Sequence, residues 1–264
     1  MDIVLKILLP TALTALALWR RALTRGGLLL AWGLGLVISL CGGATGFLAL
    51  AAVFLCTVAA GRLNRRLRER VEREVHAKRG RRDAVQVACN VATGALMLLL
   101  WRLTGWRGLL YAYGGAMAAS LADSLASELG ILSRRRPRDV LTRALVPRGL
   151  SGGVTAFGFA MSAVGAAVVA LICALGWGED QGAWMGFSVT LSGVLAALGD
   201  SVLGSALQAK YRCPVCGALT ERPVHCGVPG ALERGLAGLN NDGVNLCNNL
   251  LGAGLGMLLY IIGI

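Results

Sequence analysis

Long apolar runs alternate with short basic or polar stretches along the whole chain. Several runs reach the ~20 residues that an α-helix needs to cross the hydrocarbon core of a bilayer. We place eight apolar spans at 3–19, 27–42, 44–60, 84–101, 106–129, 151–177, 183–207 and 243–263. The pattern predicts an all-α fold, a polytopic membrane helix bundle of about eight transmembrane helices (seven to nine), with residues 1–264 as a single transmembrane domain.

The segment 27–60 leaves the number of spans open, because glycines interrupt it at CGGATG (41–46). Glycine is a poor helix former, so the run can break there. One arrangement is a hairpin of two spans. The other is one long tilted helix followed by a re-entrant piece.

The net charge of +12 is concentrated in the polar stretches on one side of the predicted topology. With an even number of spans and the N-terminus outside, all 26 Lys and Arg residues except Lys6, Arg102 and Arg107 fall on the inside. This positive-inside pattern explains the charge without nucleic-acid binding, which we do not expect. We expect an integral protein of a bacterial-type plasma membrane, with both termini outside and the functional site on the cytoplasmic side.

The stretch 61–82 is expected to extend the third span into the cytoplasm as a basic helix. Leu63, Leu67, Val71 and Val75 recur every four residues and give it a narrow apolar stripe. Two interpretations stay open for its arginines. They form a solvated positive-inside stop, or they contact anionic lipid head groups or the phosphates of a nucleotide.

Five of the 14 acidic residues lie at or just inside the predicted cytoplasmic ends of apolar spans. They are Asp83, Asp123, Glu128, Asp200 and Asp242. An ionisable group inside a membrane costs a few kcal/mol, needs a partner and usually marks a site or a pathway. The apolar spans therefore predict a functional site at their cytoplasmic ends.

Amides and hydroxyls accompany these acids at helical spacing, so that each segment presents a polar stripe on one face. Four such segments direct their stripes to the same depth of the membrane. The single-face stripes are Asp83, Gln86 and Asn90; Asp200, Gly204 and Gln208; and Asp242, Asn245 and Asn249, while DSLAS (123–127) and DSVLGS (200–205) both carry Asp-Ser followed by small residues.

The stripes have two possible explanations. A single stripe is often interhelical glue, since amides and hydroxyls hydrogen-bond between helices in a membrane. Several carboxylates at one depth repel one another unless cations lie among them. Carboxylate, hydroxyl and amide oxygens suit a hard cation such as Mg²⁺, and Mg²⁺ beside arginines implies phosphate chemistry. We therefore expect a Mg²⁺ and phosphate site in the cytoplasmic leaflet.

The segment PRGLSGGVT (147–155) predicts a glycine-rich turn at the cytoplasmic start of the sixth span. Backbone N–H groups at the start of a helix bind anions. The arginines of the preceding loop (131–150) strengthen the prediction of a phosphate site. No GxxxxGK[ST] pattern is present, so a P-loop is excluded.

The loop 209–240 contains a small cytoplasmic insert with a CxxC pair followed by an adjacent His and Cys. Three thiolates and one imidazole can form a closed tetrahedral zinc site. Two interpretations stay open. Cys213, Cys216, His225 and Cys226 bind a structural Zn²⁺, or they are free or redox-active thiols beside a histidine.

Six motifs, in this order, resemble an integral membrane family that includes the plant phytyl-phosphate kinase of tocopherol synthesis. They are RDAVQVACN, LADSLASELG, RRRPR, PRGLSGGVT, GDSVLGSALQAK and NNDGVN, and the resemblance covers about 30–264. The stretch from Asp123 to Gly153 is more weakly similar to the pattern of dolichol kinase and phosphatidate cytidylyltransferase. Those enzymes use CTP and Mg²⁺ on a lipid substrate.

The resemblance implies a kinase that converts an isoprenoid monophosphate (phytyl, geranylgeranyl or farnesyl) to the diphosphate with a nucleoside triphosphate, CTP being favoured. It implies that Asp123, Glu128, Asp200 and Asp242 are catalytic and hold Mg²⁺. Ser151, Gly152 and Gly153 would cradle a phosphate, while Arg134, Arg138, Arg148 and Lys210 would neutralise the transferred group. Asp83, Gln86, Asn90, Asn241, Asn245 and Asn249 would shape the site, with Ser124, Ser127, Ser201 and Gln208 beside them.

Three other functions compete with the kinase. One is another phosphoryl or nucleotidyl transferase acting on lipids. A second is a transporter or flippase of a polyprenyl-phosphate lipid, which would need a polar path to the far side of the membrane. The third is a scaffold, which would not need so many acids at one depth. The sequence gives no indication of the isoprenoid chain length or the oligomeric state.

Overall fold

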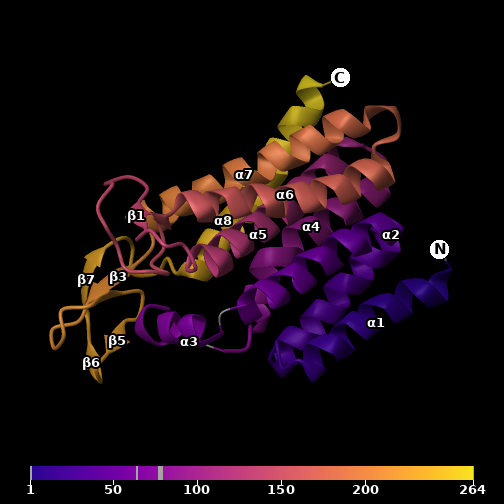
Figure 1. The fold of residues 1–264 in the computed structure, drawn as a ribbon. Helices are drawn as coiled ribbons and strands as arrows, with labels where there is room; N and C mark the ends of the chain where they lie inside the picture. Colours follow the sequence, from indigo (N-terminus) through magenta and orange to yellow (C-terminus); the bar gives the residue numbers. More distant parts are fainter. Residues whose placement is uncertain (1, 64, 77–79, 264) are drawn as a thin grey trace.

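The computed structural model describes residues 2–63, 65–76 and 80–263 as a helix bundle with short strands at one end (Figure 1). Five described helical segments are long and apolar enough to cross a membrane: α2, α4, α6, α7 with the turn before it, and α8. The predicted all-α polytopic bundle is therefore confirmed. The helices are α1 (Ile3–Trp19), α2 (Arg25–Leu63), α3 (Arg65–Glu74), α4 (Ala84–Thr104), α5 (Gly108–Gly130), α6 (Ala156–Trp177), α7 (Gly182–Ala206) and α8 (Asn241–Ile262), with a 3-10 turn at Glu179–Gln181.

Helix α2 is a hairpin, which decides between the two arrangements left open for 27–60. Its backbone leaves helical geometry at Gly43, where φ is 63° and ψ is −148°. A Cβ on Gly35 would lie 3.8 Å from the Leu50 side chain, whereas a continuous helix would separate the two residues by roughly 22 Å. The two halves are therefore antiparallel, and they correspond to the predicted spans 27–42 and 44–60.

Helix α5 forms the centre of the bundle, since it contacts α2, α4, α6, α7 and α8. Small residues let its neighbours approach closely, as is common between helices in membranes. A Cβ on Gly115 would lie 2.1 Å from the Gly252 carbonyl oxygen of α8. At the end that carries the chain termini, Tyr111, Tyr113 and Met117 are almost completely buried. This half of the bundle is solidly packed.

The strands lie at the opposite end, beside α3 (Figure 1). Strand β1 (Arg138–Asp139) pairs antiparallel with β2 (Gly153–Val154). In the insert, β3 (Lys210–Arg212) lies between β4 (Leu219–Thr220) and β7 (Ala231–Arg234), and β5 (Val224–His225) pairs with β6 (Val228–Pro229). Short paired strands therefore organise the loops 131–155 and 207–240.

Two elements differ from their predicted bounds. Helix α6 begins at Ala156 rather than 151, because Ser151–Val154 form a turn and β2, and Thr155 caps the helix by accepting a hydrogen bond from the Gly158 N–H (3.0 Å). Helix α3 covers only part of the predicted basic extension 61–82 and ends at Glu74. Two residues of the predicted apolar stripe, Val71 and Val75, pack on Leu150.

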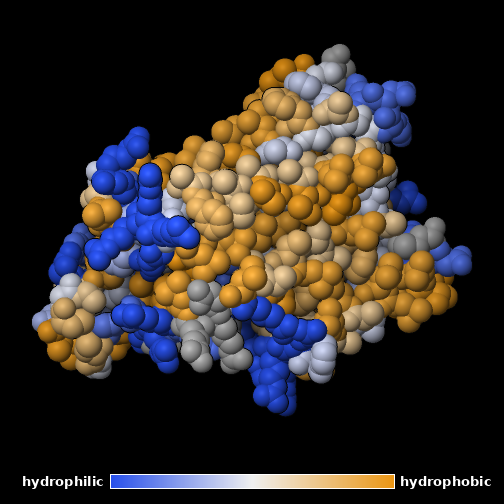
Figure 2. Space-filling view, in the orientation of Figure 1, coloured by the Kyte–Doolittle hydropathy of each residue, from blue (hydrophilic) through white to orange (hydrophobic). Residues whose placement is uncertain are grey.

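The surface separates into an apolar flank and a hydrophilic end. Figure 2 shows hydrophobic side chains over the sides of the bundle, many hydrophilic ones near α3 and the strands, and smaller hydrophilic groups at the opposite end. Many large apolar side chains on the helices are exposed, among them Leu29, Leu171 and Leu175. Such a belt suits hydrocarbon rather than water.

Candidate functional site

A cavity of about 260 Å³ lies at the strand-bearing end of the bundle. Helices α3 to α8 all contribute to its lining, together with the glycine-rich turn before α6. It brings together many of the predicted site residues: Gln86, Asn90, Asp123, Ser124, Ser127, Glu128, Arg148, Ser151, Gly152, Gly153, Asp200, Ser201, Asn241 and Asn245.

Two carboxylates from facing helices dominate this cavity. Asp123 on α5 accepts a hydrogen bond from Ser127 Oγ (3.4 Å), and the charge of Arg82 attracts it. Asp200 on α7 lies near enough to Asp123 for their charges to repel. Among the described residues, buried Oδ1 of Asp200 has no hydrogen-bond partner. A buried carboxylate oxygen without a donor, beside a second carboxylate, is the environment that a bound cation stabilises.

Glu128 lies on the cavity but is already neutralised by the protein. Its Oε2 is 3.1 Å from Nε of Arg68 on α3. This ion pair holds α3 against the end of α5. The geometry thus gives Glu128 a different environment from Asp123 and Asp200, although sequence reasoning grouped the three as metal ligands.

The polar stripe of α4 divides into a cap and a wall. Asp83 is the N-cap: its Oδ1 accepts from the Gln86 N–H (2.9 Å), and its own N–H donates to Gln86 Oε1 (3.1 Å). Asn90 donates to the Gln86 carbonyl (2.9 Å). Gln86 and Asn90 line the cavity, whereas Asp83 lies outside the residues that line it.

The stripe of α8 divides similarly. Asn241 and Asn245 line the cavity, while Asp242 is buried outside its lining. Asn249 lies deeper, where its Oδ1 accepts from Ser120 Oγ (3.0 Å) and its Nδ2 donates to the Asn245 carbonyl (3.1 Å). At Asn249 the interhelical-glue interpretation therefore fits better than a role in the site.

The glycine-rich turn is engaged by a residue that sequence reasoning missed. Glu221, in the insert, accepts hydrogen bonds through Oε1 from the backbone N–H of Ser151 (2.9 Å) and from its Oγ (2.6 Å). The N–H of Gly153 donates to the Leu150 carbonyl (3.0 Å). A carboxylate thus holds the position that was predicted for a phosphate.

Arg148 also serves the protein itself. Its Nη1 donates to the carbonyl oxygens of Ile131 (2.6 Å) and Ser133 (2.5 Å), which follow the end of α5. The guanidinium therefore fixes the loop 131–150 against the bundle while lining the cavity.

A second polar cluster lies behind this turn and gathers several residues predicted to bind substrate. Asp139 is buried and accepts hydrogen bonds from Ser205 Oγ (2.8 Å to each carboxylate oxygen) and from the N–H of Thr142 (2.8 Å). Burial raises the pKa of Asp139, but these hydrogen bonds outweigh that effect and hold it below its ordinary value. Lys210, whose pKa is lowered by burial, donates to the Gly204 carbonyl (2.8 Å).

Four predicted residues belong to this cluster or to the surface rather than to the cavity lining. Gln208 is buried, and Arg134 is exposed. Arg138 is exposed and donates to the Arg143 carbonyl (2.9 Å). Lys210 is only 1% exposed and lies with Asp139.

A larger and more apolar groove adjoins the cavity. It has a volume of about 610 Å³ and lies between α1, both halves of α2 and α4. Leu13, Ala31, Val53 and Phe54 are among its apolar walls. The groove and the cavity share the lining residues Arg68, Gly80, Arg82, Gln86, Asn90, Ser124 and Glu128. An apolar compartment therefore adjoins a polar, carboxylate-bearing one at a rim that carries arginines.

Comparison with known proteins identifies the family. Residues 8–253 match the family described as integral membrane protein DUF92. The chain belongs to this family. None of the solved structures compared with the chain matches it.

Three similar proteins come from distant organisms. Protein PGR of Arabidopsis thaliana is 29% identical over 65% of the chain and 67% of its own length. An uncharacterized membrane protein of Synechocystis is 29% identical over 73% and 74%. Another, of Methanocaldococcus jannaschii, is 29% identical over 65% of the chain, which covers 61% of that relative's length.

Sequence reasoning missed three residues of the site: Glu221, Arg68 and Arg82. Arg68 and Arg82 were predicted only as members of a basic segment, where nothing distinguishes one arginine from the next. Glu221 lies 70 residues from Ser151, so no local spacing connects them. The depth of the acids in apolar spans did carry a signal, and it led to Asp123 and Asp200.

Proposed function

We propose that this DUF92 protein is a membrane-embedded isoprenoid-monophosphate kinase. It would convert phytyl, geranylgeranyl or farnesyl phosphate to the diphosphate with a nucleoside triphosphate, CTP being favoured, and Mg²⁺. The observation that carries the proposal is the junction of the apolar groove with the polar cavity. An isoprenyl phosphate has the same division, an apolar chain and a dianionic head. The resemblance to the family of phytyl-phosphate kinase supplies the reaction.

The groove would hold the first part of the isoprenoid chain. Its lining on α1 runs from Pro10 to Ala17, roughly 10 Å along a helix at ~1.5 Å per residue. The head group would then lie at the shared rim, where Arg82 offers positive charge and Gln86 and Asn90 offer amide groups. The rest of the chain would extend into the lipid.

Asp123 and Asp200 would hold Mg²⁺, with Ser124 and Ser201 as further oxygen donors on the same wall. The buried, unpartnered Oδ1 of Asp200 supports this fit. Bound Mg²⁺ would neutralise the charge that develops on the phosphate oxygens during transfer. Glu128, paired with Arg68, would position α3 at the rim.

The reaction requires orientation more than a strong base. An oxygen of the isoprenyl phosphate attacks the γ-phosphorus of the nucleotide, a new O–P bond forms, and the bond to the β-phosphate oxygen breaks to release the diphosphate nucleotide. The attacking phosphate is already ionised at neutral pH, so no side chain has to remove a proton. Arg82 would help to bring the two anions together by offsetting their repulsion.

The one-sided cavity supports an enzyme over a lipid transporter. In the described part of the bundle, the half of α5 that leads away from the cavity is filled by side chains such as Tyr113, Met117 and Leu121, each almost fully buried. Tyr113 also donates to the Gly46 carbonyl of α2 (2.6 Å). A transporter would need this packed half to open.

The end that bears the cavity would face the cytoplasm. The basic loops lie at this end, and the nucleotide is a cytoplasmic substrate. Both termini, which lie at the other end in Figure 1, would then be outside.

The direct test is turnover of purified protein in detergent. Phytyl, geranylgeranyl and farnesyl phosphate are supplied with Mg²⁺ and CTP, UTP, ATP or GTP in turn, and the diphosphate is detected by mass spectrometry. The proposal predicts product that depends on Mg²⁺ and disappears with Asp123→Asn. Protein that binds a polyprenyl phosphate but forms no product with any donor would favour the transporter.

A matched pair of variants on α2 tests where the isoprenoid chain of the substrate binds. Ala31→Trp fills the groove, whereas Leu29→Trp changes a side chain that is 74% exposed on the outside of the same helix. Ala31→Trp should raise KM for the isoprenyl phosphate about tenfold or more, the loss of roughly 1.4 kcal/mol of binding. Leu29→Trp should leave KM unchanged. Equal KM values in both variants would show that the isoprenoid chain binds outside this groove.

A further inference from the structure

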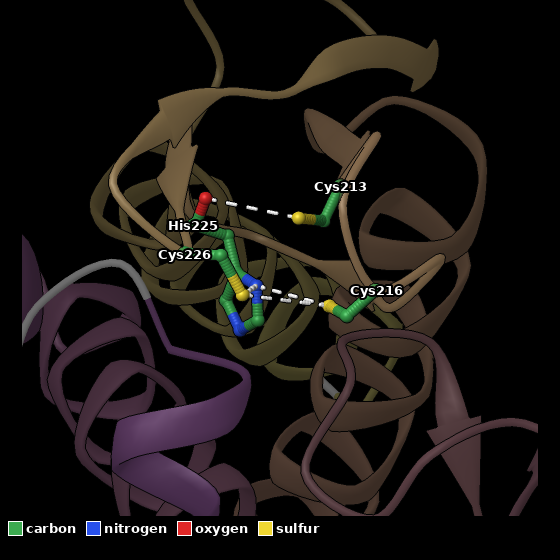
Figure 3. Close-up of side chains that lie close together, drawn as sticks. All are labelled: Cys213, Cys216, His225 and Cys226. Atoms are coloured by element: carbon green, nitrogen blue, oxygen red, sulfur yellow. Dashed lines mark hydrogen bonds between the residues drawn. The ribbon is translucent and has the colours of Figure 1, made fainter.

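The insert between α7 and α8 gathers four metal-binding side chains from two tight turns. Cys213 and Cys216 follow β3, while His225 and Cys226 come from β5 and the turn after it (Figure 3). One potential ligand atom from each residue lies within 4.8 Å of all the others. In Figure 3 the sulfurs of Cys216 and Cys226 and the ring of His225 point toward one another. The cluster lies outside the lining of both cavities.

The distances within the cluster match the edges of a zinc tetrahedron. With Zn–S bonds of about 2.3 Å and Zn–N bonds of about 2.0–2.1 Å, the edges are roughly 3.8 Å between sulfurs and roughly 3.6 Å between sulfur and nitrogen. Cys216 Sγ and Cys226 Sγ lie 3.7 Å apart. Nδ1 of His225 lies 3.4 Å from Cys216 Sγ and 3.3 Å from Cys226 Sγ. Three of the four ligand atoms thus have about the spacing of one tetrahedral face, and Cys213 Sγ lies within 4.8 Å of each of them.

The backbone of both turns suits adjacent ligands. Gly217 and Gly227 have left-handed φ angles of 71° and 78°. Gly217 donates its N–H to the Cys213 carbonyl (2.9 Å), which closes the first turn. Cys226 has a φ of 52°, which is costly for a residue with a side chain. This conformation places Cys226 Sγ beside the ring of the preceding histidine. A bond to a metal would offset the cost of the strained backbone.

The insert has little else to hold it together. The paired strands are two to four residues long, and the side chains of β7 are exposed. Small folds with so little buried apolar surface generally need a metal or disulfides. The cysteines of the cluster are free thiols in this structure.

The segment between the two ligand pairs docks on the rest of the protein. Thr220 Oγ1 donates to the Val75 carbonyl after α3 (2.9 Å), and the N–H of Glu221 donates to the same oxygen (3.0 Å). Arg222 donates to the Arg73 carbonyl (2.8 Å). Through these contacts Glu221 reaches Ser151 in the glycine-rich turn. In the sequence, the two ligand pairs therefore lie on either side of residues 220–222, the arm that carries Glu221 to the glycine-rich turn of the cavity.

We propose that Cys213, Cys216, Cys226 and Nδ1 of His225 bind one structural Zn²⁺, which fixes this arm and with it the contact between Glu221 and Ser151. All four positions of the tetrahedron are filled by protein, so the zinc is closed to substrate and to water. The zinc would take no part in the phosphoryl transfer proposed above, and this proposal does not depend on that reaction.

Metal analysis of the full-length protein tests the site. Protein purified in detergent should contain about one zinc per chain, and X-ray absorption should give three sulfur ligands and one nitrogen ligand at the bond lengths of such sites. His225→Ala should lose most of the zinc. His225→Cys, which creates a four-cysteine set, should retain it, and so should Cys247→Ser, a free cysteine of α8 outside the cluster.

Protease sensitivity tests the structural role apart from the metal content. A strong chelator should remove the zinc and speed tryptic cleavage after Lys210, Arg212 or Arg234 at least tenfold, with protection restored by added Zn²⁺. Zinc-free protein with a resistant insert would overturn the proposal, whether its thiols are free or joined as a disulfide. Zinc retained in a Cys216→Ser, Cys226→Ser double variant would also overturn it.

Discussion

Asp139 is a buried carboxylate and Asp200 a half-buried one with a buried Oδ1, and their surroundings differ. Asp139 accepts hydrogen bonds from Ser205, from the N–H groups of Leu141 and Thr142, and from Arg234 at 3.4 Å. Asp200 has a buried Oδ1 without a hydrogen-bond partner among the described residues, and it faces a second carboxylate, Asp123. The protein compensates one charge completely and leaves the other exposed to a cavity.

This difference separates a structural carboxylate from a candidate functional one. A buried charge that receives several hydrogen bonds stabilises the fold around it, and Asp139 ties the loop 131–150 to the end of α7 and to the insert. A buried charge without donors destabilises the protein by itself, so such a carboxylate either takes up a proton or is compensated by something outside the chain. Under the proposed function that partner is Mg²⁺ with its phosphate substrates.

The largest expected effect is the loss of turnover in Asp200→Asn. Removing a carboxylate that holds the cation should lower kcat on the order of 10³-fold, as other electrostatic deletions do. Thermal stability in detergent should stay the same or rise, because an uncompensated buried charge is removed. Both are measured on one preparation, by diphosphate formation and by a melting curve. Turnover above a tenth of the wild-type value would show that Asp200 does not hold the cation.

Asp139→Asn should reverse this pattern. Breaking the buried cluster should lower the free energy of unfolding by about 3 kcal/mol, because Arg234 and the other donors lose a charged acceptor. Turnover per folded molecule should stay within about twofold, since Asp139 does not line the cavity. Denaturant unfolding with activity measured on the folded fraction checks both values. Asp180→Asn, in the exposed turn at the other end, is the matched control.

The pH dependence of stability should give a smaller effect, which tests whether Asp139 is a structural carboxylate. The pKa of Asp139 in the folded protein lies below its ordinary value, with its hydrogen bonds outweighing burial. Its contribution to stability is therefore fully present above the unfolded pKa of about 3.9 and is lost as pH falls through the folded value. The difference in unfolding midpoint between wild type and Asp139→Asn should shrink between pH 6 and pH 3. A difference that grows on acidification would contradict this assignment.

The sequence predicted the parts of this molecule that local physical constraints determine. Apolar runs gave the helices, and the cost of charge in such runs led to Asp123 and Asp200. The hydrophobic pattern could not decide the hairpin of α2, because the corner depends on tertiary packing: Gly42 and Gly46, on the two sides of Gly43, lie against Leu98 of α4. Asp139 and Glu221 lie in polar loops where an acid carries no signal, and their partners are 66 and 70 residues away.

Residues of the same predicted polar stripe also have different roles, which their spacing in the sequence does not reveal. Gln86 and Asn245 reach the cavity, while Asp83 caps α4 and Asn249 joins two helices. All four share one helical periodicity. Only the depth of each side chain and the partner within reach separate a cap, a wall of the site and an interhelical bond.

Binding of Mn²⁺ is the most direct test of the central claim, that the carboxylates of the cavity are compensated by a divalent cation. Mn²⁺ prefers the same oxygen ligands as Mg²⁺ and can be followed by electron paramagnetic resonance. Wild-type protein in detergent should bind Mn²⁺ in competition with Mg²⁺, Asp123→Asn and Asp200→Asn should weaken binding at least tenfold, and Asp139→Asn should leave it unchanged. Equal binding in all four proteins would contradict the account, as would a loss in Asp139→Asn alone.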